Sequence, residues 1–265
     1  MNINNTSGLR SNTKIDILIP VIEKDLAILP FTIDSVRQNA NHPIGDIMVV
    51  APDNQKIKQV CALKESKFID ENSVLPIKKN NINYKTKKWD RSGWLFQQLL
   101  KLNGDTICSA EHYLVMDADT LLIRPHIFKY NQKTVFYCRR TKNAEYFRTY
   151  KKLMGQKAMA PLSFVSHYML FEKSKVMELK KKIEFRNKTT WFTAIIQSIN
   201  KSCPVTFSEF ETYGNYFYLK YPKQLIMKNA LNLNLKRAEI QNISSLNLQE
   251  LAEKHRSVSF HSWNT

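Results

Sequence analysis

The sequence contains few residues that break regular structure and few that could cross-link it. Its 265 residues include 6 glycines, 9 prolines and 4 cysteines. This scarcity excludes collagen-like and low-complexity architectures, and the widely spaced cysteines predict neither a disulfide framework nor a structural zinc site. No run approaches the roughly 20 apolar residues that span a bilayer, and the polar residues 1–14 lack the apolar core of a signal peptide. We therefore expect a cytoplasmic protein.

Hydrophobic residues and positive charge are abundant instead. Hydrophobic residues make up 43% of the chain, which excludes a disordered protein. There are 40 Lys and Arg against 23 Asp and Glu, a formal net charge of +17. Such an excess implies an anionic partner, which could be nucleic acid, a membrane surface or a phosphorylated substrate. The length fits one domain, which we expect to span residues 15–265 after a flexible N-terminus, 1–14.

Apolar runs alternate with amphipathic segments in the first part of the chain. Residues 15–20 and 46–51 are short apolar runs that predict buried strands, and residues 29–39 and 54–63 predict helices. Strand–helix alternation of this kind predicts an α/β fold with a mostly parallel sheet flanked by helices. The polar, lysine-rich segment 65–90 predicts an irregular excursion.

Periodicity continues beyond that segment. The sequence predicts a helix over 92–102, strands over 112–116, 135–139, 164–171 and 203–207, helices over 174–183, 190–200 and 247–255, and a final strand over 257–260.

The most informative segment is 113–125, in which an apolar strand leads directly into Asp117-Ala-Asp119. In an extended backbone the two carboxylates point the same way, and they repel each other unless a cation lies between them. Hard oxygen ligands at the carboxyl end of a parallel strand suit Mg²⁺ or Mn²⁺ with substrate phosphates as further ligands. The alternative interpretation is a polar turn, because aspartate is common there.

This segment, with its Thr, two leucines and nearby proline, resembles the nucleotide-sugar glycosyltransferases of GT-A fold. The helix at 91–102 is similar to segments of bacterial surface-polysaccharide transferases, some of which are known only as domains of unknown function. Three further segments, 166–171, 209–214 and 260–263, resemble parts of those enzymes that face the donor, the acceptor and the metal.

The resemblance implies roles for the residues that match its motifs. Asp119 would be the main metal ligand, and Asp117 would reach the metal or the ribose hydroxyls. His261 could add an imidazole nitrogen, which favours Mn²⁺ over Mg²⁺. A frayed C-terminal tail is the alternative for His261. In the opening strand and loop, Pro20 and Val21 would contact the nucleotide.

Other assignments have plain structural alternatives. Arg91 could approach the diphosphate or be a solvated charge, and Asp53 could contact the base or ribose or belong to a turn. We expect Glu209 or His167 to be the catalytic group, although His167 could be a hydrogen-bonded core residue. The Ser208–Glu211 spacing predicts a capping box, so Glu211 is assigned to the helix end.

The resemblance implies an enzyme that transfers a sugar from a nucleotide-sugar donor to a glycan or lipid-linked acceptor, with inverting and retaining chemistry both open. The nucleotide-binding half would be 15–125 and the acceptor-binding half 126–265. The charge would hold the enzyme at the inner face of an anionic membrane during surface-polysaccharide synthesis. The rivals are a basic nucleic-acid-binding protein and a metal-dependent nucleotidyl- or phosphotransferase. The lysines are spread through the chain and no nucleic-acid-binding signature is present, so we expect no nucleic-acid partner. The absence of a glycine-rich phosphate loop argues against the second rival.

Overall fold

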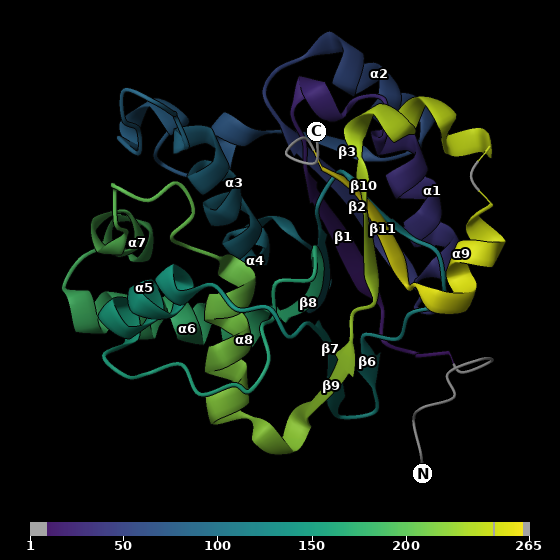
Figure 1. Ribbon diagram of the computed structural model, residues 1–265. Coiled ribbons are helices and arrows are strands. Elements are labelled where there is room, and N and C mark those ends of the chain that lie inside the picture. The colour runs from purple at the N-terminus through teal and green to yellow at the C-terminus, as the bar shows by residue number, and fades with distance from the viewer. Residues whose placement is uncertain (1–9, 246, 262–265) are drawn as a thin grey trace.

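The buried strands predicted from apolar runs form the central sheet of the protein (Figure 1). A computed structural model describes residues 10–245 and 247–261. The sheet has the strand order β3-β2-β1-β4-β8, in which the first four strands are parallel and β8 is antiparallel to β4. The strands are β1 (Ile15–Pro20), β2 (Ile44–Ala51), β3 (Lys67–Asp70), β4 (His112–Met116) and β8 (Tyr168–Glu172).

Helices cover both faces of this sheet, which is why its strands read as continuous apolar runs. Ile15, Ile17 and Ile19 of β1 share one hydrophobic core with α1 (Leu29–Asn39) and α2 (Gln55–Leu63). The opposite face packs on the other helices. They are α3 (Ser92–Leu102), α5 (Ala144–Met154), α6 (Lys173–Asn187), α7 (Trp191–Ser198) and α8 (Glu209–Lys220), with the short α4 (Gly104–Ile107) beside them.

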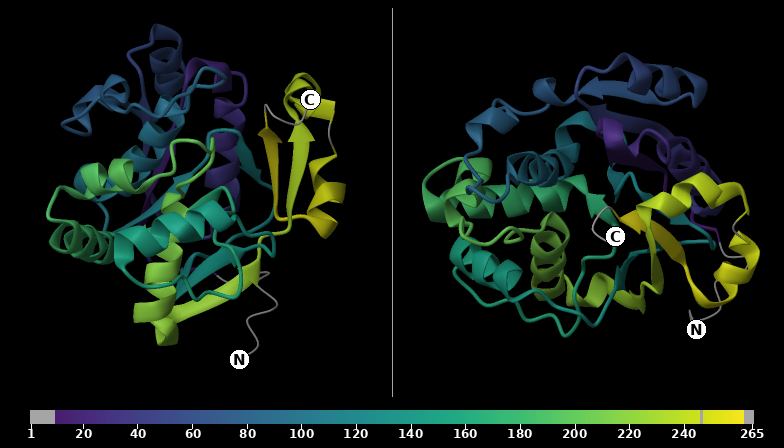
Figure 2. Two further views of the ribbon diagram at one scale, coloured as in Figure 1. Left: turned by 60° about the vertical axis from the view of Figure 1, so that its left-hand side comes forward. Right: turned by 45° about the horizontal axis from the view of Figure 1, so that its top comes forward.

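Two small sheets complete the fold on the side away from α5, α6 and α7, where Figure 2 shows the C-terminal strands in yellow. One sheet contains β10 (Asn232–Lys236), β11 (Ser257–His261) and β5 (Thr120–Leu122), and the other contains β6 (Lys129–Tyr130), β7 (Lys133–Cys138) and β9 (Leu225–Asn229). Because β11 pairs antiparallel with β5, it lies beside the turn that follows β4.

Short helices occupy the connections. They are η1 (Glu23–Asp25), η2 (Glu71–Ser73), η3 (Lys79–Asn81), η4 (Pro222–Gln224), η5 (Arg237–Ser245) and α9 (Leu248–Lys254).

Three local predictions were wrong. The strand expected over 164–171 begins only at Tyr168, because His167 has a φ of 71°, in the left-handed region, which interrupts an extended backbone. Residues 203–207 form no strand. The segment 65–90 contains the edge strand β3, whose residues are only half-buried and therefore lack a strong apolar pattern.

The N-terminal segment is attached to the domain where it is described. Residues 1–9 lie outside the described residues, but Ser11 is buried and its amide donates a hydrogen bond to the carbonyl of Asn41. The four cysteines are free.

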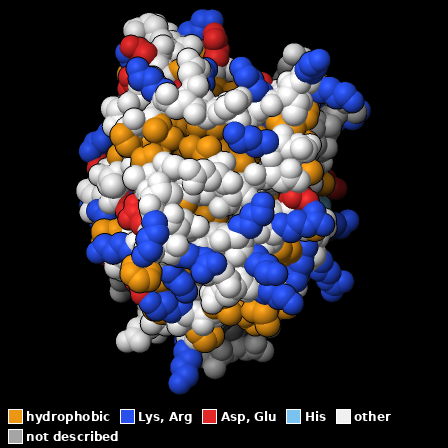
Figure 3. Space-filling view, turned by 90° about the vertical axis from the view of Figure 1, so that its left-hand side faces the viewer, with side chains coloured by type: hydrophobic (Ala, Val, Ile, Leu, Met, Phe, Trp, Pro, Cys, Tyr) orange, Lys and Arg blue, Asp and Glu red, His pale blue; other side chains and the backbone are white. Residues whose placement is uncertain are grey.

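Basic side chains outnumber acidic ones on one face of the molecule (Figure 3). On the side formed by α5, α6 and α7, Figure 3 shows blue side chains prevailing over red ones. Among the residues described, no helix is both long enough and apolar enough to cross a membrane.

Candidate active site

Asp117 and Asp119 stand at the carboxyl end of β4, in the turn that leads into β5. The turn is fixed from two directions. The carbonyl of Ala118 accepts a hydrogen bond from Oγ1 of Thr32 in α1, at 2.8 Å, and the amide of Asp117 donates to the carbonyl of His167, also at 2.8 Å. The backbone between the two acids is therefore held by the sheet and by the helix that covers it.

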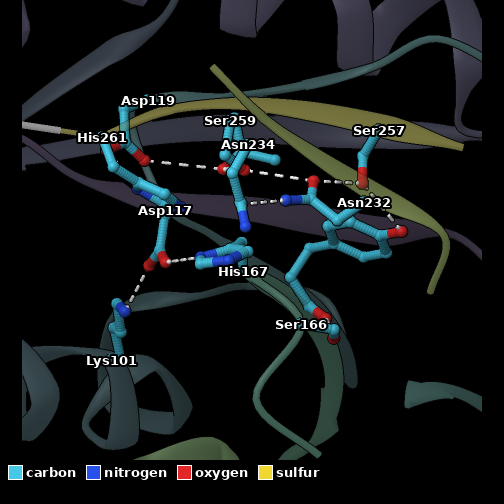
Figure 4. Close-up of polar contacts among 12 residues, drawn as sticks. Lys101, Asp117, Asp119, Ser166, His167, Asn232, Asn234, Ser257, Ser259 and His261 are labelled. Atoms are coloured by element: carbon cyan, nitrogen blue, oxygen red, sulfur yellow. Dashed lines mark hydrogen bonds and ion pairs between the residues drawn. The ribbon is translucent and has the colours of Figure 1, made fainter. Parts of the chain in front are cut away.

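Asp117 lies between two nitrogen groups, as Figure 4 shows. Its Oδ1 is 2.5 Å from Nζ of Lys101 and its Oδ2 is 3.0 Å from Nδ1 of His167. Lys101 also reaches Oε1 of Glu209 at 2.8 Å, so one ammonium group joins two carboxylates from different helices and strands. The side chain of Lys101 is 6% exposed and that of Glu209 is fully buried.

The charges of this cluster are set by competition between burial and pairing. Burial alone would lower the pKa of Lys101, but the carboxylates of Asp117 and Glu209 outweigh it and raise that pKa. Burial would raise the pKa of Asp117, but Lys101 and His167 hold it well below its usual range. Burial raises the pKa of Glu209 although Lys101 opposes the change, and burial lowers the pKa of His167 although Asp117 opposes it. Lys101 is thus charged and Asp117 is a carboxylate.

Asp119 has a different partner, supplied by the far end of the sequence. Its Oδ2 lies 3.3 Å from Nδ1 of His261, the last residue of β11. The amide of Phe260 donates to the carbonyl of Asp119 at 2.9 Å, which fixes β11 against the turn. The rings of His167 and His261 lie 4.6 Å apart, so the two aspartates and two histidines form one cluster.

This cluster faces a cavity of ≈ 480 Å³ at the carboxyl ends of β1 and β4. Its wall includes both aspartates, both histidines and Lys101. The other polar lining residues are Lys24, Asp25, Arg91, Gln97, Gln98, Arg139, Tyr146, Ser208 and Asn234. A second cavity, of ≈ 760 Å³, shares Lys24, Arg91, Trp94 and Gln97 with the first, so the two are adjoining parts of one cleft.

The side chains on the Asp119 side fit a divalent metal. Two ligands bound to one ion at about 2.1 Å and at right angles lie about 3 Å apart, close to the separation of Asp119 and His261. Within 10–245 and 247–261, no three acidic, His or Cys side chains are arranged as a complete metal site. The reason is visible in the contacts, because both oxygens of Asp117 are turned to Lys101 and His167.

The structure brings together most of the residues predicted for the site, but not all of them. Pro20 and Arg91 line the first cavity. Val21 is buried and lines neither cavity. Asp53 is also absent from both walls, because its side chain is 70% exposed and paired with Lys58 at 2.5 Å.

The two glutamates of α8 differ from the expectation. Glu209 lies behind the cavity wall, which Ser208 and Phe210 form, so its carboxylate meets Lys101 instead of an acceptor. Ser208 does cap α8 by accepting from the amide of Glu211. The Glu211 carboxylate does not return to the cap, however, and instead accepts from Oγ of Ser163 at 2.6 Å.

Sequence reasoning missed Lys101, the residue that joins Asp117 to Glu209. The signal was present in the helix predicted over 92–102. Lys101 follows Gln98 by three residues and precedes Leu102, so it falls on the face that the helical period buries. A lysine on a buried face requires acidic partners, because burying an unpaired charge is costly.

A family model matches residues 12–261 of this chain. The chain belongs to DUF6492, a family of unknown function. No curated protein sequence matches it.

Comparison with solved structures identifies the fold of this DUF6492 protein. The apo crystal structure of mouse xyloside xylosyltransferase 1 matches with a TM-score of 0.53 and 9% identity, over 96% of this chain and 99% of that one. The galactosyltransferase LgtC, in complex with donor and acceptor sugar analogs, matches with a TM-score of 0.47 and 12% identity, over 93% and 87%. The DUF6492 protein is thus a single α/β domain of GT-A fold, as the sequence predicted.

Proposed function

We propose that this DUF6492 protein is a metal-dependent glycosyltransferase that moves a sugar from a nucleotide-sugar donor to a glycan or glycolipid acceptor. One observation carries the proposal. Asp119, two residues after Asp117 at the carboxyl end of β4, meets His261, which β11 brings from the other end of the domain, and all three line a ≈ 480 Å³ cavity. Ligands of α/β sheets bind in the crevice beyond the carboxyl ends of the strands.

Asp119 and His261 would hold the divalent ion, and Asp117 would join them by turning from Lys101. An imidazole ligand favours Mn²⁺ over Mg²⁺. When bound, such an ion provides Lewis-acid stabilisation of the negative charge that develops on the departing diphosphate.

Basic residues of the cleft attract the same diphosphate. Lys24 and Arg91 line both cavities, so a donor that spans them must pass these two cations. The planar guanidinium of Arg91 can bind two phosphate oxygens at once. Lys24 and Arg91 would therefore help to orient the diphosphate of the donor.

Of the two predicted catalytic groups, His167 lines the cavity and Glu209 does not. Nδ1 of His167 is fixed by Asp117 at 3.0 Å, and the buried Nε2 has no hydrogen-bond partner among the described residues. Because burial lowers the pKa of His167, the neutral ring offers a lone pair at Nε2. Its left-handed backbone, with φ of 71°, is the kind of strain that functional sites retain. Glu209 acts through Lys101 as a positioning residue.

In this proposal the two halves of the domain bind different substrates. Residues 15–125 bind the nucleotide and residues 126–265 bind the acceptor. The exposed ring of Phe185 in α6 has its centre 4.3 Å from Nζ of Lys188, and Lys181 and Lys182 of the same helix are also exposed, as binding to an anionic membrane surface would require. This arrangement supports a role at the inner face of the cytoplasmic membrane in bacterial surface-polysaccharide synthesis. Vesicles of anionic lipid should bind the protein at low salt, and neutral vesicles should not.

The central test is incubation with Mn²⁺ and a panel of nucleotide sugars, with release of nucleoside diphosphate as the measurement. We expect release with at least one donor, and loss of that release after chelation of the metal. If no donor is hydrolysed or transferred, and no nucleotide binds in a metal-dependent manner, the proposal is wrong.

A further inference from the structure

The larger cavity of the cleft contains an acidic group that the proposed function leaves unused. This cavity of ≈ 760 Å³ adjoins the catalytic cavity and is lined by Pro52, which follows β2, and by Glu71, which follows the edge strand β3. The parallel strands β1, β2 and β3 end at the same edge of the sheet. Glu71 therefore lies in the crevice where α/β sheets bind ligands. It follows β3, which pairs with β2, and β2 pairs with β1 at the smaller cavity.

Glu71 is a buried carboxylate without a partner. Only 7% of the residue is exposed, and its carboxylate receives no hydrogen bond or ion pair from any residue that the structure describes. Burial raises the pKa of Glu71, and the charge of Lys79 on the same wall opposes that rise. Glu71 lines the cavity, so its carboxylate is available to accept hydrogen bonds from a ligand there.

The remaining walls suit a flat ring. Trp94 and Phe96 contribute aromatic surface, and Ile22 and Ile82 contribute apolar surface. Aromatic side chains bind nucleobases by stacking, whatever the base. Selection among bases must come from hydrogen bonds at the edge of the ring. Asp90 of this wall already accepts a hydrogen bond from the amide of Ser92, so Glu71 is the acidic residue available to the base.

The two cavities are joined by the residues that would contact the phosphates. Lys24 and Arg91 line both of them, and the guanidinium of Arg91 lies 6.0 Å from the centre of the Trp94 ring. A nucleotide with its diphosphate near Asp119 and Arg91 therefore places its base in the larger cavity.

We infer that Glu71 selects the donor by its base, and that the donor carries a nucleobase with an exocyclic amino group, with guanine the best match. The carboxylate has two acceptor oxygens, and guanine presents two adjacent N–H donors, at N1 and N2. Cytosine and adenine present one amino group each. Uracil presents one N–H between two carbonyl oxygens, which a carboxylate repels. This inference rests on the proposed function.

The test is calorimetric binding of GDP, CDP, ADP and UDP in the presence of Mn²⁺. The intact protein should bind GDP about tenfold or more tightly than UDP, since a bidentate pair discriminates bases by factors of this order. Glu71→Gln keeps the size of the side chain and should weaken GDP binding by about tenfold while UDP binding stays the same or improves. Glu65→Gln, an exposed glutamate that lines neither cavity, is the matched control and should change nothing.

Each other outcome overturns the inference in a recognisable way. A preference of the intact protein for UDP contradicts it directly, whether or not the variant folds. Equal weakening of all four nucleotides by Glu71→Gln would assign Glu71 to the ribose instead of the base. In both cases Mn²⁺-dependent binding remains and the glycosyltransferase proposal survives. Absence of binding by all four nucleotides would reject both proposals together.

Discussion

The two aspartates at the ≈ 480 Å³ cavity are paired in different ways. On one side, Asp117 is joined through buried Lys101 to buried Glu209, and each charge has a partner. On the other side, Asp119 pairs with His261, and its side chain is 17% exposed at the cavity. Two partners hold Asp117 in place without a ligand, whereas Asp119 has one partner in these ion pairs and is available to a ligand.

Removal of Lys101 should produce the largest effect and would break the paired side. In Lys101→Met, Asp117 and the fully buried Glu209 lose their shared cation. Breaking a buried pair in this way costs about 3–5 kcal/mol in the free energy of unfolding, measurable by urea denaturation. Lys56→Met, which removes an exposed partner of Glu23, should have little effect. If Lys101→Met is as stable as the intact protein, the cluster does not fix the site.

Asp119→Asn should break the available side without affecting the paired one. The substitution keeps the shape of the side chain but removes the charge that a metal requires. We expect Mn²⁺-dependent binding of nucleoside diphosphates to weaken by about 100-fold, or about 3 kcal/mol, with the free energy of unfolding nearly unchanged. Asp53→Asn, at a surface aspartate outside both cavities, is the control. Unchanged affinity in Asp119→Asn would remove the metal assignment.

His126 sharpens the comparison, because it is a buried base without an acidic partner. Burial lowers its pKa to about 3, in spite of a hydrogen bond with the carbonyl of Arg124, whereas carboxylates raise the pKa of buried Lys101. Below pH about 6.5 the unfolded state takes up a proton that the folded state refuses, so stability falls as the pH falls.

The expected slope for His126 is about 1.4 kcal/mol per pH unit between pH 6.5 and 3, with no contribution above pH 7. Urea denaturation at pH 7, 6 and 5 measures it, and His126→Gln should remove that part of the slope whatever its absolute stability. Parallel profiles for the two proteins would contradict the prediction.

The smallest effect is expected from Ser259→Ala, behind the Asp119 side. Oγ of Ser259 lies 2.8 Å from Oγ1 of Thr120 and 3.1 Å from Oδ1 of Asn232, so it links β11 to both neighbouring strands. We expect a loss of about 1–2 kcal/mol in stability and less than a tenfold loss in Mn²⁺ affinity. Ser174→Ala, at an exposed hydroxyl, is the control. A larger loss of affinity than of stability would make Ser259 part of the metal site.

The parts of the fold that could be predicted are those with a strong local pattern. The bounds of β1, α1, α3 and β4 agree with the apolar runs and helical periods of the sequence. The three residues of β5 and the two of β6 are too few to show any alternation. Short elements of this kind are decided by tertiary pairing, which no local period records.

The candidate site was also predictable only where the sequence pattern is local. The Asp117-Ala-Asp119 spacing and the strand before His261 are local patterns, and the cluster that they predict is present. Contacts between distant residues were hidden. Nothing local to Glu209 indicates that Lys101 pairs with its carboxylate, and nothing local to His167 indicates its left-handed backbone.

The pairing of β11 with β5 also determines when His261 can reach Asp119 during synthesis of the chain. His261 follows Asp119 by 142 residues. At about 5–20 residues per second, a ribosome needs roughly 7–28 s to add the second partner after the first. Throughout that interval the nascent chain has its two aspartates and much of its central sheet, but it lacks the histidine that completes their cluster. The contact between Asp119 and His261 therefore forms only after β11 has left the ribosome and joined the sheet.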